Sequence, residues 1–318
     1  METPVLDLAG NDQLADVQHE VLSRIHRPLF AVVDGGCFDD LADELADKGI
    51  ASRSLFRDGG DEALRRDGPW LVQLVDDHSR EHMEALALER PCTVFWSCPK
   101  GEEALWRHLR TLNQILIPDT RIPDNNEKSG LPIKYERVIF RHWDPNVLAS
   151  VLPLLDQQQL ACLFGPAEVI LMNGSNYDGL KRAIRPPELP GGLNGPLRIR
   201  PSQIEELKKA MLHSSRIRIA RFLKGQVPPN FSGIDDKFLW GATLASESSA
   251  DELGIKTERG RARWAYVMML SDGKAAKLKE VRSYIQDGRD SPDNRVKSLI
   301  QHTANAIRTG GLANGALA

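Results

Sequence analysis

The sequence predicts an α/β protein, with an N-terminal lobe built on a central β-sheet flanked by helices and an all-helical C-terminal lobe. Three observations lead to this prediction. Short apolar runs alternate with helical periodicity up to residue 172, a segment rich in Gly and Pro follows, and only helical patterns come after it. We therefore expect an α/β domain at residues 1–172, a linker at 173–200 and a helical lobe at 201–318.

The N-terminal lobe begins with a helix predicted over residues 14–25, where apolar residues recur at helical spacing. Leu29 to Val33 is a continuous apolar run, which is typical of a strand buried on both faces. The alternation then repeats along the chain. Further strands are expected over 52–56, 70–75, 93–96, 137–143 and 169–172, and helices over 38–48, 62–66, 78–88, 102–115 and from Asp144-Pro145 onwards.

The C-terminal lobe is expected to begin with a helix at Ser202, because Glu205 lies three residues later and completes the pattern of a capping box. This helix should end near Lys224-Gly225. Apolar spacing predicts four more helices, and the small, polar tail is expected to fray. These helices cover residues 235–252, 257–270, 274–286 and 292–308, and the tail covers 309–318.

The composition is that of a globular protein, with 41% hydrophobic and 27% charged residues in a chain of 318. The four cysteines form no C-x-x-C pair, which excludes the usual zinc and thioredoxin-like motifs and suits a reducing compartment. The first ten residues have no basic segment of the kind that begins a secretory signal, and no apolar run approaches the roughly 20 residues that span a bilayer. We therefore expect a cytoplasmic protein without a membrane partner.

Charge is divided unevenly along the chain, although the formal net charge is only −3. Residues 1–100 hold 10 more acidic than basic residues, whereas residues 201–318 hold 6 more basic than acidic ones. Two surfaces with different partners would explain this division, and so would two lobes that are merely kept soluble by their charged faces.

The usual enzyme motifs are missing: there is no phosphate-binding glycine loop, no G-x-G-x-x-G and no G-x-S-x-G. Asp34-Gly35-Gly36 follows a buried strand, where α/β enzymes often place a catalytic acid, and Asp39 and Asp40 lie close in sequence. A metal-dependent or small-molecule enzyme that uses Asp34 is therefore an alternative. The simpler interpretation is a strand-to-helix turn made by Asp and Gly.

Three other groups of residues were weighed for chemistry. His78 and His82 have the i, i+4 spacing of metal ligands, but Ser79 stands where a zinc protease has Glu, and no third ligand is evident. The segment from Arg141 to Pro145 could support acid–base chemistry, or could be a strand end followed by an Asp-capped helix in which Arg141 pairs with an acid. Basic residues cluster around 216–224, yet the pI of about 6.3 argues against a dedicated nucleic-acid binder.

Several short motifs, in a fixed order, resemble the type VI secretion effector-adaptor family called Tap or Tec. They are Phe30 to Gly35, Ser54 to Phe56, Gly68 to Val72, His108 to Arg110, Pro118-Asp119, Arg141 to Pro145 and Leu163 to Pro166. His142 departs from the family pattern, which has an aromatic residue there, and a neutral imidazole can fill the same space. The residues that carry the resemblance, and that we expect to have structural roles, are Asp34, Gly35, Gly68, Pro69, Leu109, Arg110, Arg141, Trp143, Asp144, Pro145, Phe164, Gly165 and Pro166.

The resemblance implies a non-catalytic adaptor or chaperone that binds a cognate secreted effector and loads it onto the spike protein VgrG. It implies no cofactor, no metal and no enzymatic turnover, and its partners would be proteins and not nucleic acid or membrane. The identity of the effector does not follow from these motifs, because specificity resides on exposed helices and loops.

Overall fold

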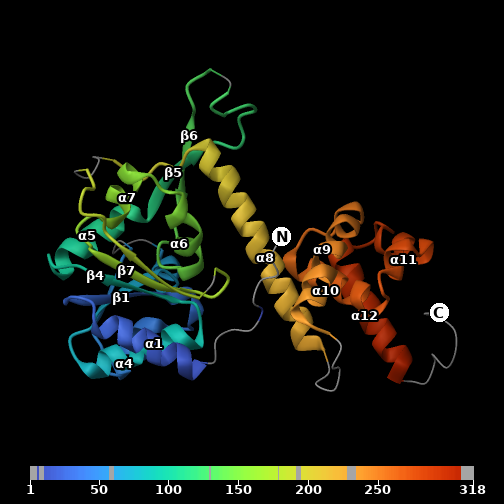
Figure 1. The fold of residues 1–318 in the computed structure, drawn as a ribbon, viewed down its shortest axis with the longest axis horizontal. Coiled ribbons are helices and arrows are strands. Elements are labelled where there is room, and N and C mark those ends of the chain that lie inside the picture. Colours follow the sequence, from blue (N-terminus) through green and yellow to red (C-terminus); the bar gives the residue numbers. More distant parts are fainter. Residues whose placement is uncertain are drawn as a thin grey trace. The chain divides into compact units, whose positions relative to one another are not determined.

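The computed structural model consists of two compact units, one of residues Leu8–Met211 and one that combines Met1–Asp7 with Leu212–Ala318 (Figure 1). The structure describes Leu6 and residues 11–56, 61–128, 130–177, 179–190, 195–227 and 234–308, without the side chains of residues 11, 12 and 303–308. The predicted tail 309–318 and almost all of the first ten residues lie outside these ranges. Among the helices that are described, none combines the length and apolar composition needed to cross a bilayer.

A six-stranded sheet forms the centre of the first unit, in the order β2-β3-β1-β4-β7-β8. Every neighbouring pair is antiparallel, and Val32 of the central strand lies opposite Leu71 of β3 and Val94 of β4. The strands are β1 (Leu29–Asp34), β2 (Ser52–Ser54), β3 (Pro69–Gln73), β4 (Thr93–Ser97), β7 (Val169–Gly174) and β8 (Gly179–Ile184). The sheet flanked by helices confirms the predicted fold class.

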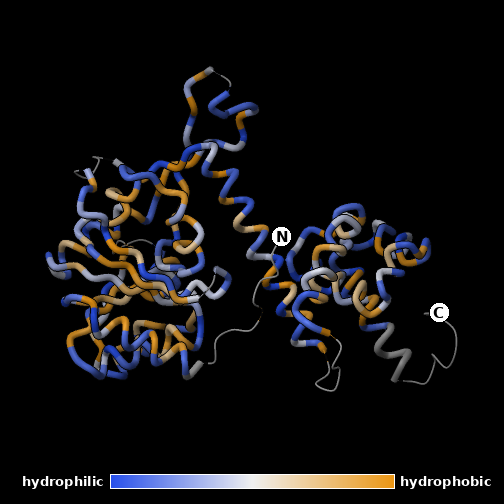
Figure 2. Tube along the Cα trace, viewed as in Figure 1, coloured by the Kyte–Doolittle hydropathy of each residue, from blue (hydrophilic) through white to orange (hydrophobic). Residues whose placement is uncertain are grey.

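Helices cover both faces of this sheet, and this arrangement explains why the apolar runs are continuous. All six residues of β1 are buried, and the middle strands are coloured mostly as hydrophobic in Figure 2. Alternate residues of β1 belong to two different core clusters: Ala31 and Val33 pack with α1, α2 and α4, and Phe30 and Val32 pack with α5, α6 and α7. These helices, with a short α3, are α1 (Asn11–Ser23), α2 (Leu41–Asp47), α3 (Glu62–Arg66), α4 (Asp77–Glu89), α5 (Glu102–Leu112), α6 (Pro145–Val151) and α7 (Gln157–Phe164).

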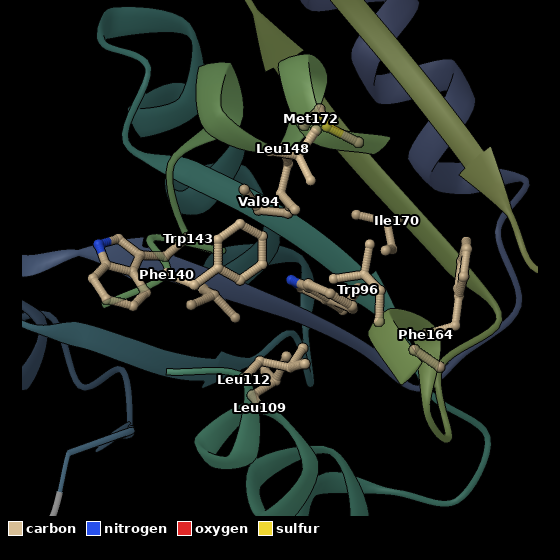
Figure 3. Packing of buried hydrophobic residues seen from close by; sticks show 14 of the residues in the cluster. Val94, Trp96, Leu109, Leu112, Phe140, Trp143, Leu148, Phe164, Ile170 and Met172 are labelled. Carbon is tan, nitrogen blue, oxygen red and sulfur yellow. The ribbon is translucent and has the colours of Figure 1, made fainter. Parts of the chain in front are cut away.

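The second cluster is the larger one and surrounds Trp96, which is fully buried. Figure 3 shows Trp96 in the middle of the cluster, with Leu109 and Leu112 of α5 beside it and Ile170 of β7 close by. Large, fully buried aromatic side chains of this kind dominate the energetics of a core.

A second, two-stranded sheet was not predicted. It includes the end of the predicted helix over 102–115 and the first part of the predicted strand over 137–143. Here α5 ends at Leu112, and β5 (Gln114–Pro118) pairs antiparallel with β6 (Tyr135–Ile139), outside the main sheet. The helix stops because the Asn113 side chain turns inward and donates its Nδ2 to the Leu55 carbonyl at 2.8 Å. The short continuous apolar run from Ile115 to Ile117, rich in β-branched residues, then favours a strand.

The segment predicted as a linker, 173–200, is mostly part of the fold where it is described. It contains the end of β7 and all of β8, which pair along their whole length. Leu197 and Ile199 are buried, and backbone hydrogen bonds of 2.8 and 2.9 Å join this stretch to Leu116 of β5. Gly and Pro mark turns in this segment, but the apolar residues between them lie in stretches that pair with β7 or with β5. The division between the compact units falls later, between Met211 and Leu212.

The second unit is entirely helical over its described residues, as predicted. The predicted capping box at Ser202 and Glu205 is wrong, because helix α8 begins at Pro201 and the Gln203 side chain reaches back to accept from the Arg200 N–H at 2.8 Å.

The remaining helices of the chain are α8 (Pro201–Gln226), α9 (Asp236–Glu252), α10 (Glu258–Leu270), α11 (Lys279–Ile285) and α12 (Pro292–Arg308). Three short 3-10 turns are also described, namely η1 (Gly35–Cys37), η2 (Leu152–Leu154) and η3 (Lys274–Lys277).

Candidate functional site

An ion pair between two of the predicted motif residues marks the centre of the candidate site. Asp34, at the end of β1, is 4% exposed, and its Oδ2 accepts a 2.5 Å hydrogen bond from Nη2 of Arg141. The other oxygen, Oδ1, accepts from the backbone N–H of Gly36 at 3.2 Å and caps the turn η1. Both carboxylate oxygens of Asp34 are therefore engaged within the protein. Arg141 keeps about half of its side chain exposed (52%).

The same arginine lies beside the start of helix α6. Asp144 accepts hydrogen bonds from the backbone of Asn146 and Val147, at 2.9 and 3.3 Å, and Pro145 occupies the first turn. Arg141 lies 3.6 Å from the Asp144 carboxylate. Burial raises the pKa of Asp144, and the positive charge of Arg141 acts against that shift. The interpretation of this motif as an Asp-capped, Pro-started helix with a paired arginine is confirmed.

Gly35, Gly68 and Pro69 allow two backbone segments to approach closely next to Asp34. The Gly35 N–H donates to the Gly68 carbonyl at 2.9 Å, and Pro69 lies opposite Asp34 in the β1–β3 register. A Cβ on Gly35 would lie 2.6 Å from that carbonyl oxygen, and a Cβ on Gly68 would lie 2.4 Å from the Phe56 ring. Only glycine fits at either position without displacing its neighbours.

Trp143 and His142 fill the space between this junction and the core. Trp143 is 4% exposed and meets Phe56 edge-on, with 5.9 Å between ring centroids. His142 is fully buried, and its Nε2 lies 3.0 Å from Oδ1 of Asn113. Burial lowers the pKa of His142 to about 3, so the ring is neutral near pH 7. A neutral imidazole therefore occupies the position at which the family pattern has an aromatic residue.

The motifs His108 to Arg110 and Leu163 to Pro166 meet each other in the core. His108 Nε2 lies 2.9 Å from the Leu163 carbonyl, and a Cβ on Gly165 would lie 2.3 Å from the His108 ring. Leu109 and Phe164 are buried in the same core. The carbonyl of Pro166 accepts from the Cys98 thiol at 3.6 Å. The structure thus divides the motif residues into two groups, one around Asp34 and one around Gly165.

Arg110 is a motif residue whose side chain lies outside the hydrophobic core. Its guanidinium lies over the indole of Trp106, 4.2 Å from the ring centroid, and the guanidinium of Arg53 lies 3.5 Å from the same centroid. Sequence reasoning did not single out Arg53 or Trp106. The four-residue spacing of Trp106 and Arg110 on one helix was a signal that could have been noticed, but Arg53 comes from a separate strand, β2.

The other candidates lie apart from this site. His78 on α4 has its Nε2 3.1 Å from the Lys48 carbonyl oxygen. Within the described part of the chain, no three His, Cys, Asp or Glu residues group together as metal ligands would.

Basic residues of α8 are largely paired with acids inside the helical unit. Arg216 forms a bidentate pair with Glu247, with hydrogen bonds of 2.6 and 2.7 Å, and Arg218 pairs with Glu258. Lys224 lies 2.8 Å from Asp236. These pairs neutralise much of the basic cluster around residues 216–224, which a nucleic-acid binder would leave exposed.

No curated protein and no solved structure matched the chain. One family model matches residues 29–162, from the first residue of β1 to within α7, and so includes Asp34, Arg110, Arg141 and the segment between them. This stretch of the chain is similar to the family described as "Domain of unknown function (DUF4123)", which is associated with type VI secretion effector adaptors.

Proposed function

We propose that this protein is a non-catalytic, cytoplasmic adaptor that binds a cognate type VI secretion effector and loads it onto the VgrG spike. The observation that carries the proposal is the match of residues 29–162 to a family associated with such adaptors. In this proposal the protein needs neither a cofactor nor a metal, and it is a chaperone of its cargo without turnover.

The geometry of the motif residues supports a scaffold. Asp34, the residue best placed to be a catalytic acid, is buried, and both of its oxygens are hydrogen-bonded to Arg141 and to its own turn. Gly35 and Gly68 hold two backbones in contact, and Asp144 caps a helix. Groups that are satisfied in this way stabilise a rigid body and leave recognition to the exposed surface.

Co-purification tests the proposal directly. The tagged chain is expressed together with the product of the adjacent toxin gene and with VgrG, and is recovered at low salt. We expect both proteins to be retained, and we expect deletion of the adaptor gene to stop secretion of that toxin while other secreted proteins are unaffected. Retention of neither protein, with normal secretion of the toxin, would refute the adaptor function.

The substitution Asp34→Asn separates the adaptor from the alternative, an enzyme that uses this carboxylate. Asn keeps an oxygen for the Gly36 N–H but loses the charge that pairs with Arg141. A scaffold predicts lower thermal stability and an unchanged partner list. A variant that folds with wild-type stability but loses a measurable turnover would instead favour the enzyme.

A further inference from the structure

The surface around Trp106 has a chemistry that the scaffold does not require. The indole Nε1 donates to the Ser54 carbonyl at 3.0 Å, which fixes the ring against the edge strand β2. Two guanidinium groups lie over this ring, those of Arg53 and Arg110. A stacked guanidinium keeps its N–H groups in one plane, so that it is already oriented to bind a carboxylate with two parallel hydrogen bonds.

These residues line an open hollow of about 420 Å³. Among the described residues that line it, three are arginines, none is Asp or Glu, and the other large side chains are aromatic. The hollow is lined chiefly by Arg53, Arg65, Arg110, Phe56, Trp70 and Trp106.

Arg110 has the least compensated charge of this group. It is partly buried, and within the described residues its guanidinium meets no carboxylate. Arg53 does have an acidic neighbour, Glu103, at 2.7 Å, but that carboxylate is 52% exposed and is shared with Arg107. A partly desolvated cation of this kind gains most from an acid that arrives with a partner.

The charge of the surrounding lobe limits what that partner can be. Residues 1–100 hold 10 more acidic than basic residues, so the hollow is a small basic area on an acidic lobe. A long polyanion such as nucleic acid would be repelled by the rest of the lobe, whereas a short acidic segment would meet mainly the arginines, with Glu103 beside Arg53. The hollow also contains aromatic surface, which suits a peptide.

We propose that this hollow, which we call the Arg–Trp platform, docks a short segment of the protein cargo that is rich in Asp and Glu. The proposal rests on the proposed adaptor function for the identity of the partner. The carboxylates of the segment pair with Arg53 and Arg110, and its backbone or apolar atoms cover the exposed part of Trp106.

Peptide binding tests the platform independently of the cargo. The probe is a fluorescein-labelled octaglutamate, and fluorescence anisotropy measures its affinity for the full chain at low salt. We expect R53Q/R110Q to bind roughly tenfold more weakly or worse, because two charge-assisted hydrogen-bonding groups are lost. The control R24Q/R121Q removes two arginines that are 71% and 73% exposed, that do not line the hollow and that share no acid with Arg53 or Arg110. It should stay within about twofold of wild type, a change of less than 0.5 kcal/mol, as expected for exposed charges.

Each result decides for or against the platform. Equal affinities for wild type and R53Q/R110Q, with equal thermal unfolding midpoints, would overturn the proposal. Equal losses in both double variants would also overturn it, because net charge alone would then explain binding. Tighter binding of an eight-nucleotide oligothymidylate than of octaglutamate would assign the surface to nucleic acid instead.

Co-purification with the toxin then separates this proposal from the adaptor function. If wild type and R24Q/R121Q retain the toxin and R53Q/R110Q does not, the platform is its docking site. If all three retain it, the adaptor function stands and the platform is not the cargo site. If none retains it while octaglutamate binding still depends on Arg53 and Arg110, the platform stands and the proposed partner is wrong.

Discussion

Replacing Gly165 by Ala is expected to destabilise the N-terminal unit far more than the same change at another glycine with positive φ. Gly165 follows α7 with φ +51° and ψ −117°, a conformation that residues with a Cβ rarely adopt. The new Cβ would lie 2.3 Å from the His108 ring. The ring cannot move away freely, because its Nε2 lies 2.9 Å from the Leu163 carbonyl.

The magnitude follows from these two effects. A strained backbone conformation costs about 1–3 kcal/mol, and displacing the ring gives up a hydrogen bond that contributes about 1 kcal/mol. We therefore expect Gly165→Ala to lower the free energy of unfolding by about 2–4 kcal/mol. Gly49 is the matched control: its φ is +69°, but no described atom lies within 4 Å of its Cβ position. Gly49→Ala should cost only about 1 kcal/mol.

Urea unfolding followed by circular dichroism measures the free energy of unfolding of both variants. In thermal unfolding their melting temperatures should differ by roughly 2–12 °C for a unit of this size. A third variant identifies the cause. In a H108A background the conflict with the ring is gone and only the backbone strain remains, so G165A should cost about 1–3 kcal/mol more than H108A alone. The reasoning is refuted if G165A and G49A have equal effects, or if removing the His108 ring leaves the cost of G165A unchanged.

Three further predictions concern the rest of the chain. Arg141→Gln leaves a buried carboxylate without its cation and should lower the free energy of unfolding in urea by about 2–3 kcal/mol, whereas Arg121→Gln, at a side chain that is 73% exposed, should change it by less than about 0.5 kcal/mol. His142 is neutral in the folded state, with its pKa lowered from 6.5 to about 3, so stability falls as the pH drops from 6.5 towards 3 because only the unfolded chain takes up the proton. When the pH is lowered from 7 to 5, the free energy of unfolding of the wild type should fall by about 2 kcal/mol more than that of H142F, as measured in matched denaturant titrations. Equal decreases in the two proteins would contradict the burial of a neutral ring. A chain that ends at Met211 should unfold cooperatively by circular dichroism. A chain that ends at Arg200 should be less stable, because it lacks the buried Gln203 and its 2.6 Å hydrogen bond to the Leu154 carbonyl. Equal stability of the two chains would show that the start of α8 adds nothing to the N-terminal unit.

The predicted fold class followed from patterns that are local in the chain. The run from Leu29 to Val33 is buried on both faces as predicted, because helices cover both sides of the sheet. The helix over 62–66 was predicted with its observed bounds, and Asp144-Pro145 was correctly interpreted as a helix start. Capping and periodicity act over a few residues, and the sequence displays them directly.

Other features depend on which distant segments pair, and no local pattern shows this. The strand order of the main sheet and the separate β5–β6 sheet arise from pairing between segments that are well separated in the chain, whereas β8 pairs with β7, the strand just before it. The segment 173–200 looked like a linker because its Gly and Pro residues are visible in sequence, whereas the neighbours that its apolar residues meet are not.

Sequence alone singled out most residues of the candidate site, and the tertiary structure showed what they contact. Asp34 and Arg141 were both singled out, but they are 107 residues apart, and only the folded chain brings their charges within 2.5 Å. Arg110 was singled out without a role, and the role proposed here depends on Arg53 reaching the same indole from another strand. The physical reason is the same in both cases: an ion pair or a stacked cation depends on distances in space, and the order of residues along the chain does not contain those distances.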